Sequence, residues 1–194
     1  MLEKSDRLIT SIQAVNRDFY IHYEDGSPVY QISALKIIEQ MIRMLAPYSC
    51  DRILEIGTGF GYSTAILSHL VGKQGKIISV DIDRDLVERA SRILQQDERI
   101  NVRVFFGDGR NGLPQESPYD KVIAWASAEQ TVPPAIVEQL TINGIVVCPV
   151  REQANSYIAS FRKNIAGKLE EITRISGGFI PMTETPFYPW LNEG

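Results

Sequence analysis

The sequence predicts an α/β protein with a mostly parallel, doubly wound sheet and an antiparallel hairpin near its C-terminus. From position 48 onward, short apolar runs alternate with amphipathic segments of about ten residues. This alternation predicts parallel strands, because each parallel connection needs a crossover that an amphipathic helix supplies. The chain has 194 residues, of which 44% are hydrophobic and 23% charged. Those proportions are typical of one globular domain.

Two helices are expected ahead of this alternating region. Residues 8–20 and 34–46 carry apolar side chains at helical spacing, most regularly in the second segment. Residues 24–28 combine Asp, Gly, Ser and Pro, which predicts a turn or loop between them. The single domain then has three parts: an N-terminal helical segment (1–47), an α/β core (48–182) and a tail (183–194). The last segment, residues 181–194, is rich in Pro and aromatic residues and is expected to lie over the body as an irregular strap.

The elements of the core follow from apolar runs and the residues that interrupt them. The expected strands are 52–56, 76–81, 101–106, 120–125 and 144–150, and the expected helices are 62–71, 84–94 and 133–140. Pro133 suits the first turn of the last helix. Residues 156–162 and 169–175 are separated by a short polar turn with no room for a crossover helix, so they are expected to pair as a hairpin at one sheet edge.

A glycine loop joins the first expected strand to the first helix of the core. Gly57, Thr58, Gly59, Phe60 and Gly61 form the pattern G-x-G-x-G. Glycines allow a tight turn and close approach of a ligand, and a helix N-terminus offers free amides. A dinucleotide fingerprint instead has G-x-G-x-x-G and holds a diphosphate. An acid just before the loop, Glu55, suits an ammonium group better than a diphosphate.

Two more acids follow the next two expected strands. Asp81 lies 24 positions beyond Gly57, close to the spacing that brings an acid to ribose hydroxyls in related folds. Asp108, between Gly107 and Gly109, is placed to accept a hydrogen bond from an adenine amino group. The carboxyl ends of parallel strands meet in one crevice, so these features are expected to converge. The alternative for any one acid is a helix cap or a solvated loop residue.

Several motifs together resemble a known family. They are Arg52–Tyr62, Gly107–Gly112, Val132–Pro133 followed by Gln139–Leu140, Gly144–Val150 and Phe179–Met182. Over residues 15–182 the chain resembles the class I S-adenosylmethionine-dependent methyltransferases, and within them the protein-L-isoaspartate O-methyltransferase family. The resemblance implies a Rossmann-like fold, S-adenosyl-L-methionine as cofactor, and O-methylation of a carboxylate such as an L-isoaspartyl residue in proteins or peptides, a protein-repair activity. The implied donor-binding residues are Glu55, Gly57, Thr58, Gly59, Gly61, Tyr62, Asp81, Ile82, Gly107, Asp108 and Gly109.

The resemblance also implies an active-site serine. The family has a Thr-Ile-Ser stretch ahead of the glycine loop, and Gln31–Ala34 stands in the matching place here. Ser33 is therefore expected to orient the acceptor, while the alternative is that it caps the helix beginning at Ala34. The chain departs from the family pattern on this side. Pro28–Gln31 lacks the usual glycines, Leu35 replaces a proline, and the stretch ahead of the serine is shorter.

Composition limits the partners and the compartment. A net charge of −4 disfavours stable nucleic-acid binding, and no segment reaches the roughly 20 apolar residues that cross a bilayer. Without an apolar leader at its start, the chain is expected to be cytoplasmic, with Cys50 and Cys148 reduced. His22 and His69 are too far apart to suggest a metal site. Nothing in the sequence indicates an oligomeric state.

Other functions stay open at this point. The acceptor could be a small molecule or RNA instead of a protein or peptide. A protein that binds S-adenosylmethionine without transferring methyl would carry the same donor motifs. A nicotinamide-dependent oxidoreductase is disfavoured by the loop spacing and by Glu55. Trp125, at the end of a strand, could line the acceptor pocket or fill the core.

Overall fold

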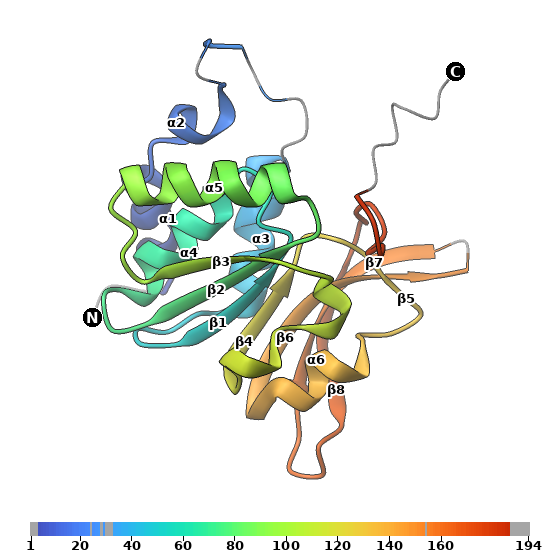
Figure 1. Ribbon diagram of the computed structural model, residues 1–194. Coiled ribbons are helices and arrows are strands. Elements are labelled where there is room, and N and C mark those ends of the chain that lie inside the picture. The colour runs from blue at the N-terminus through green and yellow to red at the C-terminus, as the bar shows by residue number, and fades with distance from the viewer. Residues whose placement is uncertain (1–3, 24, 28, 30–32, 154, 187–194) are drawn as a thin grey trace, which may run out of the picture.

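The computed structural model describes residues 4–23, 25–27, 29, 33–153 and 155–186 (Figure 1). The helices are α1 (Lys4–Ala14), α2 (Arg17–Ile21), α3 (Leu35–Leu45), α4 (Tyr62–Val71), α5 (Arg84–Gln96) and α6 (Pro134–Gln139), with 3-10 turns η1 (Gly109–Asn111) and η2 (Pro114–Glu116). The strands are β1 (Arg52–Ile56), β2 (Lys76–Asp81), β3 (Val102–Phe106), β4 (Tyr119–Ala124), β5 (Ala128–Glu129), β6 (Leu140–Glu152), β7 (Asn155–Lys163) and β8 (Leu169–Ser176). Residues 28 and 30–32, where the sequence departs from the expected family pattern, and residues 187–194 of the tail lie outside the described residues.

One sheet organises the molecule, with strand order β3-β2-β1-β4-β6-β7-β8 and the short β5 paired to β6. The first five strands of this order are parallel, and β7 and β8 add an antiparallel hairpin. The expected fold class is therefore confirmed. The chain runs from β1 outward to β2 on one side and later returns to β4 on the other. A crevice forms at such a reversal of strand order, at the carboxyl ends of the strands.

Each face of the sheet is covered by its own hydrophobic cluster. Ile53, Ile77 and Ile123 point to the face covered by α1, α3, α4 and α5. Their sequence neighbours Leu54 and Ile78 point to the other face, which is covered by α6 and the η turns (Figure 1). Successive side chains of a strand point to opposite faces, so strands buried on both sides read as continuous apolar runs.

The N-terminal helical region differs from the expectation. Residues 8–20 were expected to form one helix, but the chain breaks between α1 and α2. The side chain of Asn16 accepts a hydrogen bond from the amide of Asp18 and caps α2. Tyr20 is fully buried at the end of this short helix, where its hydroxyl donates to Asp97 after α5. The break lets α2 turn its aromatic side chain against the core.

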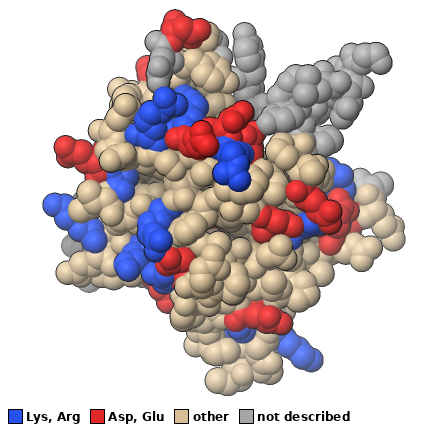
Figure 2. Space-filling view, in the orientation of Figure 1, with Lys and Arg blue, Asp and Glu red and all other residues tan. Residues whose placement is uncertain are grey.

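The surface shows no gathering of one charge on the face of Figure 2, where acidic and basic side chains lie interspersed among neutral ones. In the described part of the chain, no helix is long and apolar enough to cross a membrane. Both cysteines are free, with Cys50 exposed and Cys148 buried.

Candidate active site

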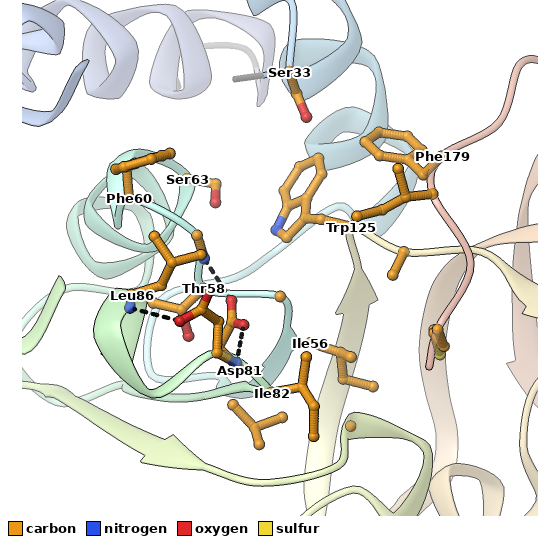
Figure 3. Close-up of a pocket in the computed structure, with 18 of the residues that line it drawn as sticks. Ser33, Ile56, Thr58, Phe60, Ser63, Asp81, Ile82, Leu86, Trp125 and Phe179 are labelled. Atoms are coloured by element: carbon orange, nitrogen blue, oxygen red, sulfur yellow. Dashed lines mark hydrogen bonds between the residues drawn. The ribbon is translucent and has the colours of Figure 1, made fainter. Parts of the chain in front are cut away.

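A cavity of about 550 Å³ lies at the carboxyl ends of β1, β2 and β4 (Figure 3). Its walls come from the glycine loop, the start of α5, the turn η1, the start of α3 and the C-terminal segment. The predicted site residues that line it are Ser33, Gly57, Thr58, Gly59, Tyr62, Asp81, Ile82, Asp108 and Gly109. Three others, Glu55, Gly61 and Gly107, do not line it. Most of the predicted site residues therefore lie around this one cavity.

The glycine loop adopts a backbone that favours glycine. Gly57, Gly59 and Gly61 have φ values of 92°, 51° and 87°. A Cβ on Gly59 would meet no protein atom within 4 Å, so the loop is open there, on the cavity. A Cβ on Gly61 would instead lie 3.4 Å from the side chain of Leu94 on α5. Gly61 therefore serves the packing of α4 against α5, while Gly59 leaves room for a ligand.

Asp81 connects the end of β2 to the glycine loop. Its carboxylate accepts from the amide of Gly59 at 2.8 Å and from the amide of Asp83 at 3.0 Å (Figure 3). The residue is only 8% exposed, and this burial raises its pKa. Asp83 in turn caps α5, accepting from the amides of Asp85 and Leu86. The carboxylate of Asp81 thus faces the cavity and is held in place by hydrogen bonds to the glycine loop and to the start of α5.

Asp108 combines a structural contact with a place on the cavity. It caps η1 by accepting from the amide of Arg110, whose guanidinium also contacts both carboxylate oxygens. The hydrogen bonds from Arg110 lower the pKa of Asp108. Next to it, a Cβ on Gly109 would clash with the side chain of Ile56, so the turn approaches β1 as only glycine allows. The neighbouring Gly107 donates its amide to the carbonyl of Asp81 and extends the strand pairing.

Glu55 lies behind the cavity wall with no exposed surface. One carboxylate oxygen accepts from Ser63 at 2.6 Å and from the indole nitrogen of Trp125 at 2.8 Å. The other accepts from Thr64 at 2.5 Å and from Ser79 at 2.8 Å. Burial raises the pKa of Glu55, opposed by these four donors. Glu55 therefore does not line the cavity, and the contact with a ligand ammonium that the sequence suggests stays a prediction.

The end of the cavity between α3 and the C-terminal segment is apolar and aromatic. Ser33 and Trp125 face each other across it, with Phe179 beside the indole at 6.2 Å between ring centroids (Figure 3). The suggestion that Ser33 caps a helix is not supported, because the N-cap of α3 is Ala34 and no side chain caps it. Trp125 packs against the core and also lines the cavity, and its contact with the acceptor stays a prediction.

The C-terminal segment forms a wall that the sequence predicted only as a strap. The hydroxyl of the buried Ser127 donates a hydrogen bond to the carbonyl of Phe179 and accepts one from the amide of Phe179. The carbonyl of Ser127 accepts a hydrogen bond from the amide of Met182, and its amide donates one to the carbonyl of Ile180. These bonds hold residues 178–183 against the cavity. The motif Phe179–Met182 was the only sequence signal for this wall.

The charged side chains that line the cavity are all acidic. Asp81, Asp83 and Asp108 line it, and the described lining includes no lysine, arginine or histidine. Such a lining favours a cationic ligand and opposes a diphosphate, since no positive group offsets the phosphate charge. The strand order, glycine loop and acidic cavity together define a class I S-adenosylmethionine-dependent methyltransferase.

The chain belongs to the Protein-L-isoaspartate(D-aspartate) O-methyltransferase (PCMT) family, whose profile matches residues 2–186. A protein-L-isoaspartate O-methyltransferase of Yersinia enterocolitica is 33% identical over 192 residues, covering 93% of this chain and 89% of the relative. Protein-L-isoaspartate O-methyltransferase 2 of Archaeoglobus fulgidus is 36% identical over 151 residues, 78% of this chain and 68% of the relative.

Solved structures agree with this assignment. One protein-L-isoaspartate O-methyltransferase superposes with a TM-score of 0.82 at 25% identity, and the match covers 91% of this chain and 61% of that one. A Plasmodium falciparum β-aspartate methyltransferase (PCMT) in complex with S-adenosyl-L-homocysteine has a TM-score of 0.78 at 20% identity, covering 93% of this chain and 91% of that one. The second likeness supports the fold alone.

S-adenosyl-L-homocysteine is expected to stabilise the protein, and NAD is not. Binding to the folded state alone raises the melting temperature, by roughly 5 to 10 °C at a ligand concentration about 100 times Kd. The three cavity carboxylates disfavour the NAD diphosphate. Thermal melts with each ligand check this, and a shift with NAD but none with S-adenosyl-L-homocysteine would contradict the donor assignment.

Proposed function

We propose that the protein transfers a methyl group from S-adenosyl-L-methionine to the side-chain carboxylate of L-isoaspartyl residues in proteins and peptides. The observation that carries the proposal is that one cavity joins two unlike ends. The acidic end, with Asp81 and Asp108 beside the glycine loop, suits a cationic nucleoside. The apolar end, with Ser33, Trp125 and Phe179, suits an acceptor group that must leave water. Membership of the family supports this choice of acceptor.

Each polar residue of the cavity has a distinct role in the proposal. Asp81 accepts hydrogen bonds from the ribose hydroxyls, since it ends β2 and faces the cavity. Asp108 accepts from the adenine amino group while Arg110 holds its carboxylate in place. Ser33 donates to the acceptor carboxylate and orients it. The glycine loop leaves space for the donor at Gly59.

The bound donor supplies a methyl group already activated on a sulfonium, so its transfer breaks a carbon–sulfur bond and forms a carbon–oxygen bond with the carboxylate. A carboxylate attacks as the anion and needs no general base, so the chain has only to align the acceptor and exclude water. The apolar wall of Trp125 and Phe179 lowers the local polarity. Attraction between the acceptor anion and the sulfonium cation is stronger there than in water.

A cytoplasmic location is part of the proposal. It is supported by the family match over residues 2–186.

The test is incubation with methyl-labelled donor and a panel of acceptors: isoaspartyl peptides, the matching aspartyl peptides, small carboxylic acids and RNA. Label released by base, as expected of a methyl ester, is expected on the isoaspartyl peptides alone. Label on RNA or on the small acids would mean that the acceptor is not an isoaspartyl residue. Binding of S-adenosyl-L-homocysteine without label on any acceptor would favour a non-catalytic binding module.

A further inference from the structure

Trp125 occupies the point where the two ends of the cavity meet. Its amide donates to the carbonyl of Ile56 at 2.8 Å, which fixes its backbone at the end of β1. A Cβ on Gly57 would lie 3.4 Å from the Cβ of Trp125, so the residue abuts the first glycine of the loop. On the other side, its indole faces Ser33 and packs near Phe179 (Figure 3). The backbone and Cβ of Trp125 therefore border the glycine loop, while its ring lies at the end of the cavity that holds Ser33 and Phe179.

A tryptophan ring at the end of a strand has rotational freedom about two side-chain bonds, and a buried contact restricts it here. The indole nitrogen donates to Glu55 at 2.8 Å. Glu55 cannot move in response, because Ser63, Thr64 and Ser79 hold its carboxylate from α4 and β2. Three elements of the fold thus converge to set the direction of one aromatic ring.

We propose that Trp125 is a specificity-determining residue whose indole forms the apolar wall for the acceptor peptide, and that Glu55 is its positioning residue. The inference rests on the proposed function for the identity of the acceptor. It assigns the conspicuous acid before the glycine loop to the acceptor side, because its carboxylate is buried and already accepts four hydrogen bonds. The acceptor class is a peptide carboxylate whose adjoining chain lies on the ring.

Two variants separate the roles of the ring and of the acid. Trp125→Phe keeps an aromatic wall but removes the N–H donor and part of the apolar area. The KM for an isoaspartyl peptide is then expected to rise about fivefold or more, with the Kd for S-adenosyl-L-homocysteine within about twofold of the parent value. Glu55→Leu keeps most of the side-chain volume and removes the oxygen that accepts the indole N–H, so the ring loses its positioning contact. Its peptide KM is expected to rise without loss of S-adenosyl-L-homocysteine affinity.

A double-mutant cycle tests whether Glu55 acts through Trp125. If it does, Glu55→Leu has no further effect on peptide KM in the Trp125→Phe background. The environment of the ring can be measured by tryptophan fluorescence in a Trp190→Phe background, in which Trp125 is the only remaining tryptophan. Its fluorescence is expected to change on saturation with isoaspartyl peptide. Before any ligand is added, the fluorescence is also expected to differ between this background and the same background carrying E55L, which lacks the acceptor of the indole N–H.

The outcomes distinguish this inference from the proposed function. Failure of the parent protein to methylate isoaspartyl peptide rejects the proposed function, while S-adenosyl-L-homocysteine affinity and Trp125 fluorescence still test the positioning role without any acceptor. Lower S-adenosyl-L-homocysteine affinity in E55L, with unchanged Trp125 fluorescence, assigns Glu55 to the donor and overturns the inference. An unchanged peptide KM in Trp125→Phe overturns the specificity role even when the parent enzyme is fully active.

Discussion

Replacement of Asp81 by alanine is expected to weaken S-adenosyl-L-homocysteine binding by on the order of 10- to 100-fold, because a charge-assisted hydrogen bond is worth roughly 1.5 to 3 kcal/mol. The change removes the carboxylate that faces the cavity. It also removes the acceptor for the amide of Gly59, which holds the glycine loop at 2.8 Å. Both losses act on the donor end. Isothermal titration of the purified variant measures the effect directly.

A matched control for Asp81→Ala is Asp85→Ala. Asp85 is an exposed acid in the first turn of α5, close in sequence but not on the cavity wall. The control removes one negative charge from the same region and is expected to leave S-adenosyl-L-homocysteine affinity within about twofold. Equal losses in both variants would mean a general effect of charge. Unchanged affinity in a folded Asp81→Ala variant would remove Asp81 from the donor site.

The buried position of Asp81 adds a pH dependence with two opposite signs. Burial raises its pKa, so the folded protein holds this proton more tightly than the unfolded chain does. The associated stabilisation of the ligand-free protein is complete below the unfolded pKa and is lost as the pH rises through the folded pKa. Donor binding needs the carboxylate, so affinity is expected to fall as the pH is lowered through that same raised pKa. Asp81→Asn should flatten both dependences, as melts and titrations across the pH range would show.

The sequence could predict the donor end because local signals mark it. β1, α4 and β2 begin and end at the expected residues. Their boundaries coincide with glycines and acids, and the buried parallel strands read as apolar runs that need no knowledge of their neighbours. Once the strands are parallel, their carboxyl ends must meet, which brings Gly57, Asp81 and Asp108 to one cavity.

The features that the sequence could not predict depend on contacts between segments far apart in the chain. The break after α1 follows from a cap at Asn16 and from burial of Tyr20 beside Asp97, which helical periodicity cannot show. The four hydrogen bonds to the carboxylate of Glu55 could not be predicted, because their donors lie 8 to 70 positions away in the sequence. Likewise, the wall at Phe179 depends on Ser127, a serine that no local pattern distinguishes.

Substitution of Ser33 by alanine is expected to lower turnover on the true acceptor by roughly 10-fold or more, about 1.4 kcal/mol of transition-state stabilisation. Ser33 lines the cavity opposite Trp125, and no side chain caps α3, whose N-cap is Ala34. The hydroxyl is therefore available to orient the acceptor, and the melting temperature and S-adenosyl-L-homocysteine affinity should stay close to those of the parent. Single-turnover rates and melts on one preparation measure both quantities.

Two further variants make the Ser33 test selective. Ser33→Thr keeps the hydroxyl and should retain much of the rate, whereas Ser33→Ala cannot. Ser91→Ala alters an exposed serine on α5, away from the cavity, and should leave the rate unchanged. A helix cap, by contrast, would cost about 1 kcal/mol of stability on its loss without slowing the reaction. Full turnover with a lowered melting temperature in Ser33→Ala would therefore reject the orienting role, because the hydroxyl would then support the fold and not the transferred methyl group.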